Sequence, residues 1–170
     1  SIGLNAFLSC SSLSSITVSA HNPVYSSLDG VVFNKNQTVL IRCPEGKVGE
    51  VTFPGNAQAA RDRRPNAGVG TPLMPGKSGI ALASHPNRTN SYTIPDGVAT
   101  INRYAFHYCT KLTDIHIPAS VTSIEYYAFY KCFSLTEFTV DNGNTAYSSL
   151  DGVLFNRDQT ELIMFPSGKS

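Results

Sequence analysis

The chain reads Ile101-Asn-Arg-Tyr-Ala-Phe106-His-Tyr-Cys109-Thr-Lys-Leu112-Thr-Asp-Ile115-His-Ile117-Pro118 in its second half. The same pattern returns 23 residues later (124 − 101) as Ile124-Glu-Tyr-Tyr-Ala-Phe129-Tyr-Lys-Cys132-Phe-Ser-Leu135-Thr-Glu-Phe138-Thr-Val140. A third copy runs from Ile2 to Val18. A period of about 20–29 residues with apolar side chains at fixed positions is typical of proteins in which each repeat stacks on the next.

Each repeat ends in a short alternating segment. Ile115 and Ile117 alternate with Asp114 and His116, a period of two that predicts a half-buried β-strand. The same alternation predicts strands at 16–18, 51–53, 92–94 and 138–140. The Ala-Phe pair earlier in each repeat lies on the return path, for which we expect short helical or irregular turns.

A second, longer duplication surrounds these repeats. Tyr25-Ser-Ser-Leu-Asp-Gly-Val-Val-Phe-Asn34 returns as Tyr147-Ser-Ser-Leu-Asp-Gly-Val-Leu-Phe-Asn156, an offset of 122 residues (147 − 25). We call residues 25–47 the N-terminal cassette and residues 147–169 the C-terminal cassette. In each, two apolar runs flank an Asn/Asp-rich turn, which predicts a β-hairpin. The runs are 30–33 with 39–43, and 152–155 with 161–165. We expect the hairpins to project from the stacked repeats or to pair with their edge.

The repeat and the cassette together resemble the BspA-like leucine-rich repeats of surface proteins. The resemblance covers about 1–54 and 91–170. It implies a leucine-rich repeat solenoid, mainly β, with inserted β-hairpins. It also implies a non-catalytic protein–protein interaction module from a cell-surface or secreted adhesion-type protein, with an extracellular location. The alternative is an architectural spacer that carries another domain outside this segment.

The repeat pattern divides the chain into three parts. Residues 1–54 hold one repeat and a cassette, and residues 91–170 hold further repeats and the second cassette. Residues 55–90 lack aromatic side chains and are rich in Gly, Pro and Ala, so they are either a loop or a degenerate repeat. Their charged residues are five basic and one acidic: Arg61, Arg63, Arg64, Lys77, Arg88 and Asp62. A mobile loop and a functional basic arm both remain open.

The composition of the chain argues against two classes of partner, nucleic acid and the membrane interior. The net charge is +1, which supplies no field for nucleic acid. No apolar run approaches the roughly 20 residues that a membrane-spanning helix needs, so we expect no direct membrane insertion. Because Ser1 already lies at the start of a repeat, we expect a mature or excised piece of a longer chain.

The residues capable of chemistry show no catalytic or metal-binding pattern. Cys10, Cys109 and Cys132 share one repeat position, and Cys43 has Phe165 as its counterpart, so we expect free thiols in the interior rather than disulfides. The histidines and cysteines lack metal-ligand spacing. The glycines before Lys77-Ser78 lack phosphate-loop spacing. We therefore expect no cofactor and no enzymatic activity.

Two surfaces are candidates for binding a protein ligand, such as host matrix or another surface protein. The first is the outward column of the strands, where Thr17, Thr52, Thr93, His116 and Thr139 should lie in register beside Ser15, Glu50, Ser91, Asp114 and Glu137. The second is a tyrosine cluster on two consecutive return segments, made of Tyr104, Tyr108, Tyr126, Tyr127 and Tyr130. Our candidate contacts are Asp114, His116, Glu137, Thr139, Thr93, Tyr104 and Tyr127. A solvated β face and a half-covered convex surface remain the alternative interpretations. The ends carry no polar cap, so we expect either flanking repeats or end-to-end self-association.

Overall fold

The computed structural model describes residues 1–3, 6–48 and 90–170. Strands and turns account for the regular structure in these ranges, which contain no helix. The strands are β1 (Tyr25–Leu28), β2 (Val31–Asn34), β3 (Val39–Arg42), β4 (Ser91–Thr93), β5 (Thr100–Ile101), β6 (Asp114–Ile117), β7 (Ser123–Ile124), β8 (Glu137–Val140), β9 (Tyr147–Leu150), β10 (Val153–Asn156) and β11 (Leu162–Met164). The described part of the chain is therefore built mainly of strands joined by turns, as the repeat predicted.

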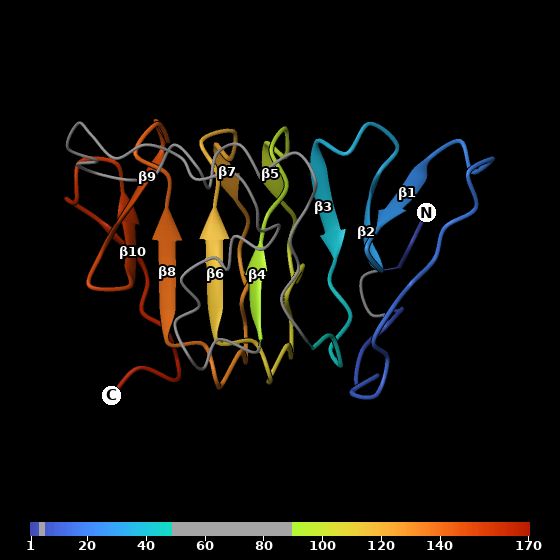
Figure 1. Cartoon of the computed structure of the whole chain (residues 1–170), viewed down its shortest axis with the longest axis horizontal. Coiled ribbons are helices and arrows are strands. Elements are labelled where there is room, and N and C mark those ends of the chain that lie inside the picture. Colours follow the sequence, from blue (N-terminus) through green and yellow to red (C-terminus); the bar gives the residue numbers. More distant parts are fainter. Residues whose placement is uncertain (4–5, 49–89) are drawn as a thin grey trace, which may run out of the picture.

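One sheet is the parallel ladder β4-β6-β8, which stands side by side in Figure 1. Its register pairs Tyr92 with Ile115 and Ile115 with Phe138, so the residues one repeat apart face each other. The strands predicted at 92–94, 115–117 and 138–140 are confirmed within a residue or two. The 23-residue period thus sets the pairing directly, because a slip of one residue would turn every apolar side chain outward.

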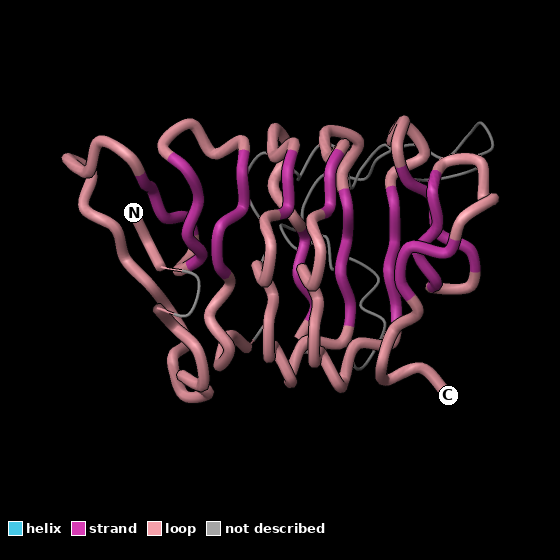
Figure 2. The backbone as a smooth tube through the Cα atoms, turned by 180° about the vertical axis from the view of Figure 1, so that it is seen from behind, coloured by secondary structure: helices cyan, strands magenta, loops and turns pink. Residues whose placement is uncertain are grey.

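A second sheet joins the N-terminal cassette to the later repeats in the order β1-β2-β3-β5-β7. Within it, β1, β2 and β3 are antiparallel neighbours, whereas β3-β5 and β5-β7 are parallel. Figure 2 shows these strands from behind, with the cassette toward the N-terminal end. The last strand of the cassette therefore becomes part of the repeat stack, which confirms that the cassette edge-pairs with it.

Both cassettes are three-stranded rather than two-stranded. The predicted hairpins β2-β3 and β10-β11 are present, each with a register shift after its first residue pair. The Tyr-Ser-Ser-Leu segments add β1 and β9 on the other side. These two strands were not predicted, because their apolar and polar residues do not alternate. They are instead held by local bonds such as Ser26 Oγ to Asn34 O (2.8 Å) and Ser148 Oγ to Asn156 O (2.9 Å).

The core lies between the sheets and the return turns. Its largest fully buried side chains include Tyr92, Phe106, Ile115 and Phe138. The rings of Phe106 and Phe129, one repeat apart, stack with centroids 5.2 Å apart. Each repeat thus completes the burial of its neighbour, and burial of a Phe or Ile contributes about 1.5–3 kcal/mol.

Four sequence expectations need correction or stay open. The segment 16–18 is not a strand, because no parallel neighbour lies beside it among the described residues. The return segments consist of turns, and the helical alternative is wrong for the described ranges. The strand expected at 51–53 and nearly all of the segment 55–90 lie outside the described residues, so the three-part division remains a prediction.

Candidate binding surfaces

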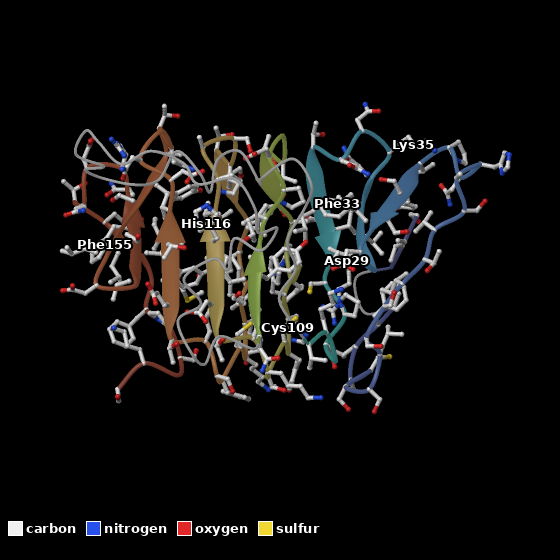
Figure 3. The ribbon with its side chains drawn as sticks, viewed as in Figure 1. Asp29, Phe33, Lys35, Cys109, His116 and Phe155 are labelled. Carbon is white, nitrogen blue, oxygen red and sulfur yellow. The ribbon has the colours of Figure 1, made fainter. Side chains whose placement is uncertain are left out.

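The outward column of the parallel ladder is present where the structure describes it. The register places His116 beside Thr93 on one side and Thr139 on the other. All three are half-buried. His116 Nδ1 lies 2.9 Å from Thr139 Oγ1, and His116 Nε2 lies 3.3 Å from Asp141 Oδ1. The imidazole is thereby held between two neighbours through both of its ring nitrogens. Figure 3 labels His116 on β6.

Thr139, His116 and Asp141 have the residue types of a hydrolytic triad, but not its arrangement. In that triad the imidazole Nε2 faces the hydroxyl and Nδ1 faces the carboxylate. Here the two nitrogens are exchanged, and Thr139 Oγ1 also lies 3.5 Å from Ile115 O. We therefore interpret the three residues as a network that fixes the imidazole.

The second column joins Ser91, Asp114 and Glu137 in register, as predicted. Asp114 is only 8% exposed and accepts a hydrogen bond from Thr113 Oγ1 (2.7 Å), so it contributes less open surface than the sequence suggested. Glu137 lies against the C-terminal cassette: a Cβ placed on Gly152 would be 3.1 Å from Glu137 Cγ. The cassette therefore borders the end of this column.

We predicted that the outward column would extend to Thr17 in the N-terminal repeat, but it does not. Thr17 lies outside any strand, although Ile16 N donates to Gly30 O (2.9 Å) and Val18 N donates to Ser27 Oγ (2.8 Å). These bonds come from the cassette instead of a parallel neighbour. Thr52 and Glu50 lie outside the described residues. The described column is thus shorter than the expected one.

The tyrosine cluster forms a stacked ladder on the return segments. The rings of Tyr104 and Tyr127 are 5.4 Å apart and 5° from parallel, and those of His107 and Tyr130 are 5.5 Å apart and 11° from parallel. Tyr126 is 74% exposed. Because ring stacking follows the 23-residue period, Tyr104 and Tyr127 are brought together as the sequence suggested.

Two cations belong to this ladder and were missed in the sequence. Arg103 lies over the rings of Tyr104 and Tyr127, at 5.2 and 5.8 Å from their centroids. Lys131 Nζ donates to Tyr108 OH at 2.5 Å, and this bond raises the pKa of the lysine. Alignment of the repeats offered the signal, since position 108 of one repeat is position 131 of the next. The surface is therefore both aromatic and cationic.

The backbone beneath the ladder has an unusual conformation. Tyr104, Tyr108, Tyr127 and Lys131 all have φ between 59° and 62°, in the left-handed region that bulky residues seldom adopt. His107 is almost buried among these rings, and that burial, reinforced by the charges of Arg42 and Lys131, lowers its pKa. The ladder can thus offer hydroxyl groups, ring edges and positive charge to a partner.

The three interior cysteines confirm the expectation of free buried thiols. Cys43, Cys109 and Cys132 are at most 3% exposed, and burial raises the pKa of Cys132. Cys10 contradicts the expectation because it is exposed. Within the described ranges no group of His, Cys, Asp and Glu could hold a metal ion. No described helix could cross a membrane.

Comparison with known proteins assigns the repeated part of the chain to a family. A family model described as a BspA type leucine-rich repeat region (6 copies) matches residues 84–168. No curated protein matches the chain.

Three solved structures resemble the chain, each over 48% of its length. A leucine-rich repeat protein from Eubacterium ventriosum is 30% identical with a TM-score of 0.46. The pneumococcal vaccine antigen PcpA is 27% identical with a TM-score of 0.39. A leucine-rich cell surface protein from Faecalibacterium prausnitzii is 29% identical with a TM-score of 0.32. The chain covers 22%, 26% and 28% of these proteins, respectively.

Proposed function

Because the chain belongs to the BspA-type leucine-rich repeat family, we propose that it is a non-catalytic protein-interaction module. In this proposal the stacked repeats form a segment of a solenoid in a cell-surface or secreted adhesion-type protein. The observation that carries the proposal is the parallel ladder β4-β6-β8, which brings Thr93, His116 and Thr139 into one row. Stacked repeats commonly use such an extended face to bind proteins.

The chemistry of the two surfaces suggests a protein ligand. The row of Thr93, His116 and Thr139 offers hydroxyl and imidazole groups, and Glu137 adds negative charge. The ladder of Tyr104 and Tyr127 offers aromatic area, and tyrosine is enriched in interfaces because it buries much area at little entropic cost. The side chains of both surfaces project from buried strands or turns that recur with the 23-residue period, so the two surfaces are preorganised for binding.

A binding assay with the 170-residue chain tests the proposal. The chain would be applied to immobilised fibronectin, laminin and type I collagen, beside a variant carrying Asp114→Asn, His116→Ala and Glu137→Ala. We expect saturable binding to at least one of these proteins and at least about a tenfold loss in the variant, which is 1.4 kcal/mol. A matched control with Asp158→Asn and Glu161→Gln, both exposed on the C-terminal cassette, should bind as the parent does.

The second candidate function is an architectural spacer. It is favoured by the low exposure of Asp114 and by the C-terminal cassette that borders Glu137, since both leave less of the column open. A spacer would bind none of the matrix proteins. Binding that survives the triple substitution but fails when Tyr104→Ala and Tyr127→Ala are introduced would move the site to the tyrosine ladder.

A further inference from the structure

The tyrosine ladder and the parallel strands differ in charge. The two return segments that form the ladder, 101–112 and 124–135, contain three basic residues and one acidic residue: Arg103, Lys111, Lys131 and Glu125. The strands β6 and β8 instead carry Asp114 and Glu137, and neither strand contains Lys or Arg. Because complementary charge steers association and like charge opposes it, the two surfaces favour different partners.

The guanidinium of Arg103 is fixed on two stacked rings. Its central carbon lies 5.2 Å from the ring centroid of Tyr104 and 5.8 Å from that of Tyr127, and these rings are 5° from parallel. No described residue forms an ion pair with this side chain. An arginine that stacks on aromatic rings keeps its N–H groups for a planar acceptor, and a carboxylate accepts two of them at once.

The ammonium group of Lys131 is fixed in a similar way. Lys131 Nζ lies 4.7 Å from the ring centroid of Tyr108 and 5.3 Å from that of Tyr130, and it donates to Tyr108 OH (2.5 Å). This hydrogen bond raises the pKa of the lysine, so the group stays charged at neutral pH. An ammonium has three donors, so two remain for a ligand. No carboxylate of the described residues pairs with it.

Exposed aromatic area lies beside both cations. Tyr126 is 74% exposed, and Tyr127 and Tyr130 are each 42% exposed. The backbone beneath is joined from one repeat to the next, since Tyr108 N donates to Tyr130 O (3.0 Å). Exposed apolar patches of this kind mark interaction sites, and rings that are already fixed lose little entropy when a partner binds.

We propose that the tyrosine ladder binds an acidic segment of a protein partner. Carboxylates of that segment accept hydrogen bonds from Arg103 and Lys131, and its apolar side chains pack on Tyr126, Tyr127 and Tyr130. The inference rests on the proposed function, which is protein binding, and adds a second site and the chemistry of the segment bound there.

The number of cations favours such a segment over a nucleic acid or a sulfated glycan. Polyanions bind through many contacts with cations, and their affinity grows with the number of charges neutralised. The ladder offers two oriented cations, and the Glu125 carboxylate lies close to one of them, because Glu125 Oε2 accepts a hydrogen bond from Arg103 N (3.0 Å). A segment with a few carboxylates between apolar residues uses both the cations and the rings.

Fluorescence anisotropy with a labelled peptide tests the proposal. The probe repeats Glu-Glu-Tyr-Gly, and its neutral counterpart repeats Gln-Gln-Tyr-Gly. We expect the chain to bind the acidic probe at least about tenfold more tightly than the neutral one, and the double variant Arg103→Gln, Lys131→Gln to lose at least about tenfold in affinity. The matched control, Lys35→Gln with Arg157→Gln, removes the same charge from exposed turns of the two cassettes and should bind as the parent does.

The variant Arg103→Lys tests the geometry of the contact. It keeps the charge and loses the planar fork, so it should bind the acidic probe more weakly than the parent and more tightly than Arg103→Gln. Unchanged circular dichroism shows that a loss of binding is not a loss of fold. Binding equal to that of the parent would overturn the paired hydrogen bonds to Arg103.

Three further outcomes decide the proposal. Equal affinity of the parent for the two probes, or of the parent and the double variant for the acidic probe, would overturn it. Binding of heparin through Arg103 and Lys131, without binding of the acidic probe, would assign the ladder to a sulfated glycan instead.

The matrix-protein assay separates this inference from the proposed function. The variant with Asp114→Asn, His116→Ala and Glu137→Ala should bind the acidic probe as the parent does. Matrix binding without probe binding would refute this inference alone. Probe binding without matrix binding would refute the choice of matrix ligand alone.

Discussion

Single residues show how one sequence position takes different roles along the stack. Cys10, Cys109 and Cys132 occupy the same position in three repeats, but only the latter two are buried. Cys132 Sγ lies 3.0 Å from Phe106 O of the preceding repeat, and Cys109 Sγ lies 3.7 Å from Pro44 O of the N-terminal cassette. The environment of each thiol thus depends on what precedes its repeat, not on the repeat itself.

Arg42 and Glu45 provide the clearest single-residue test. Arg42 Nη2 lies 2.9 Å from Glu45 Oε1 and 3.1 Å from Phe7 O, and its Nη1 donates to Tyr104 O at 2.8 Å. We expect Arg42→Met to lower the free energy of unfolding by about 3–5 kcal/mol, because the Glu45 carboxylate stays buried without its partner. Urea unfolding followed by circular dichroism measures this loss.

The C-terminal cassette supplies the control for that substitution. The double variant Arg42→Met, Glu45→Ser copies the residues at 164 and 167, and it removes both charges. We expect it to be more stable than Arg42→Met alone. Equal or lower stability would show that the hydrogen bonds to Phe7 and Tyr104, not the ion pair, hold this contact.

His107 makes stability depend on pH. Burial among the tyrosine rings lowers its pKa from the ordinary value of about 6.5, so the unfolded chain binds the proton more readily. Above about pH 6.5 both states are neutral and the residue adds no pH dependence. Below that value, stability falls as the pH falls toward the lowered pKa.

Thermal unfolding between neutral and mildly acid pH measures this effect. We expect His107→Phe, which can still stack on Tyr130, to flatten the decline of the melting temperature with falling pH. His21→Gln changes an exposed histidine and should leave the decline as it is. An unchanged slope in His107→Phe would assign the decline to other groups.

At the scale of elements, each cassette closes onto its own repeat through a glycine. Gly46 N donates to Leu13 O (2.9 Å), and Gly168 N donates to Leu135 O (2.8 Å). A Cβ on Gly46 would lie 2.6 Å from Ser11 O, and one on Gly168 would lie 2.8 Å from Phe133 O. The glycines permit a close approach of two backbones in both copies, so repeat and cassette form one structural unit.

Alanine at Gly46 should weaken the packing of the N-terminal cassette against the first repeat. We expect Gly46→Ala to destabilise the chain by about 1–3 kcal/mol, the usual cost of forcing extra atoms into a packed site. Gly143→Ala is the matched control, since its Cβ would meet only Ala119 Cβ at an ordinary 3.5 Å. The urea midpoints of the two variants measure the difference. Equal midpoints would show that the backbone shifts without cost.

At the scale of the whole molecule, both ends of the stack expose surfaces that its interior buries. Leu8 is 44% exposed at one end, and Leu162 and Phe165 are more than half exposed at the other. In repeat proteins stability comes largely from contacts between neighbours, so an uncovered end is the least stable part.

The repeat, the strand register and the hairpins could all be predicted from the sequence. The alternation of apolar and polar residues at 114–117, repeated at 137–140, indicates which side chains face inward. Because the period is fixed, only one register between these two strands keeps all of those side chains buried. The stacked tyrosines Tyr104 and Tyr127 follow from the same period. These features depend only on local or periodic sequence patterns, so they can be predicted without the tertiary structure.

Which segment packs beside each repeated unit could be learned only from the three-dimensional structure. Leu40 is buried and Leu162 exposed, Cys109 buried and Cys10 exposed, although each pair shares its local sequence pattern. Burial depends on the neighbour that packs against a residue, and identical local patterns do not specify that neighbour. The same reason explains why 16–18 is no strand and why Arg42 and Glu45 form a buried pair.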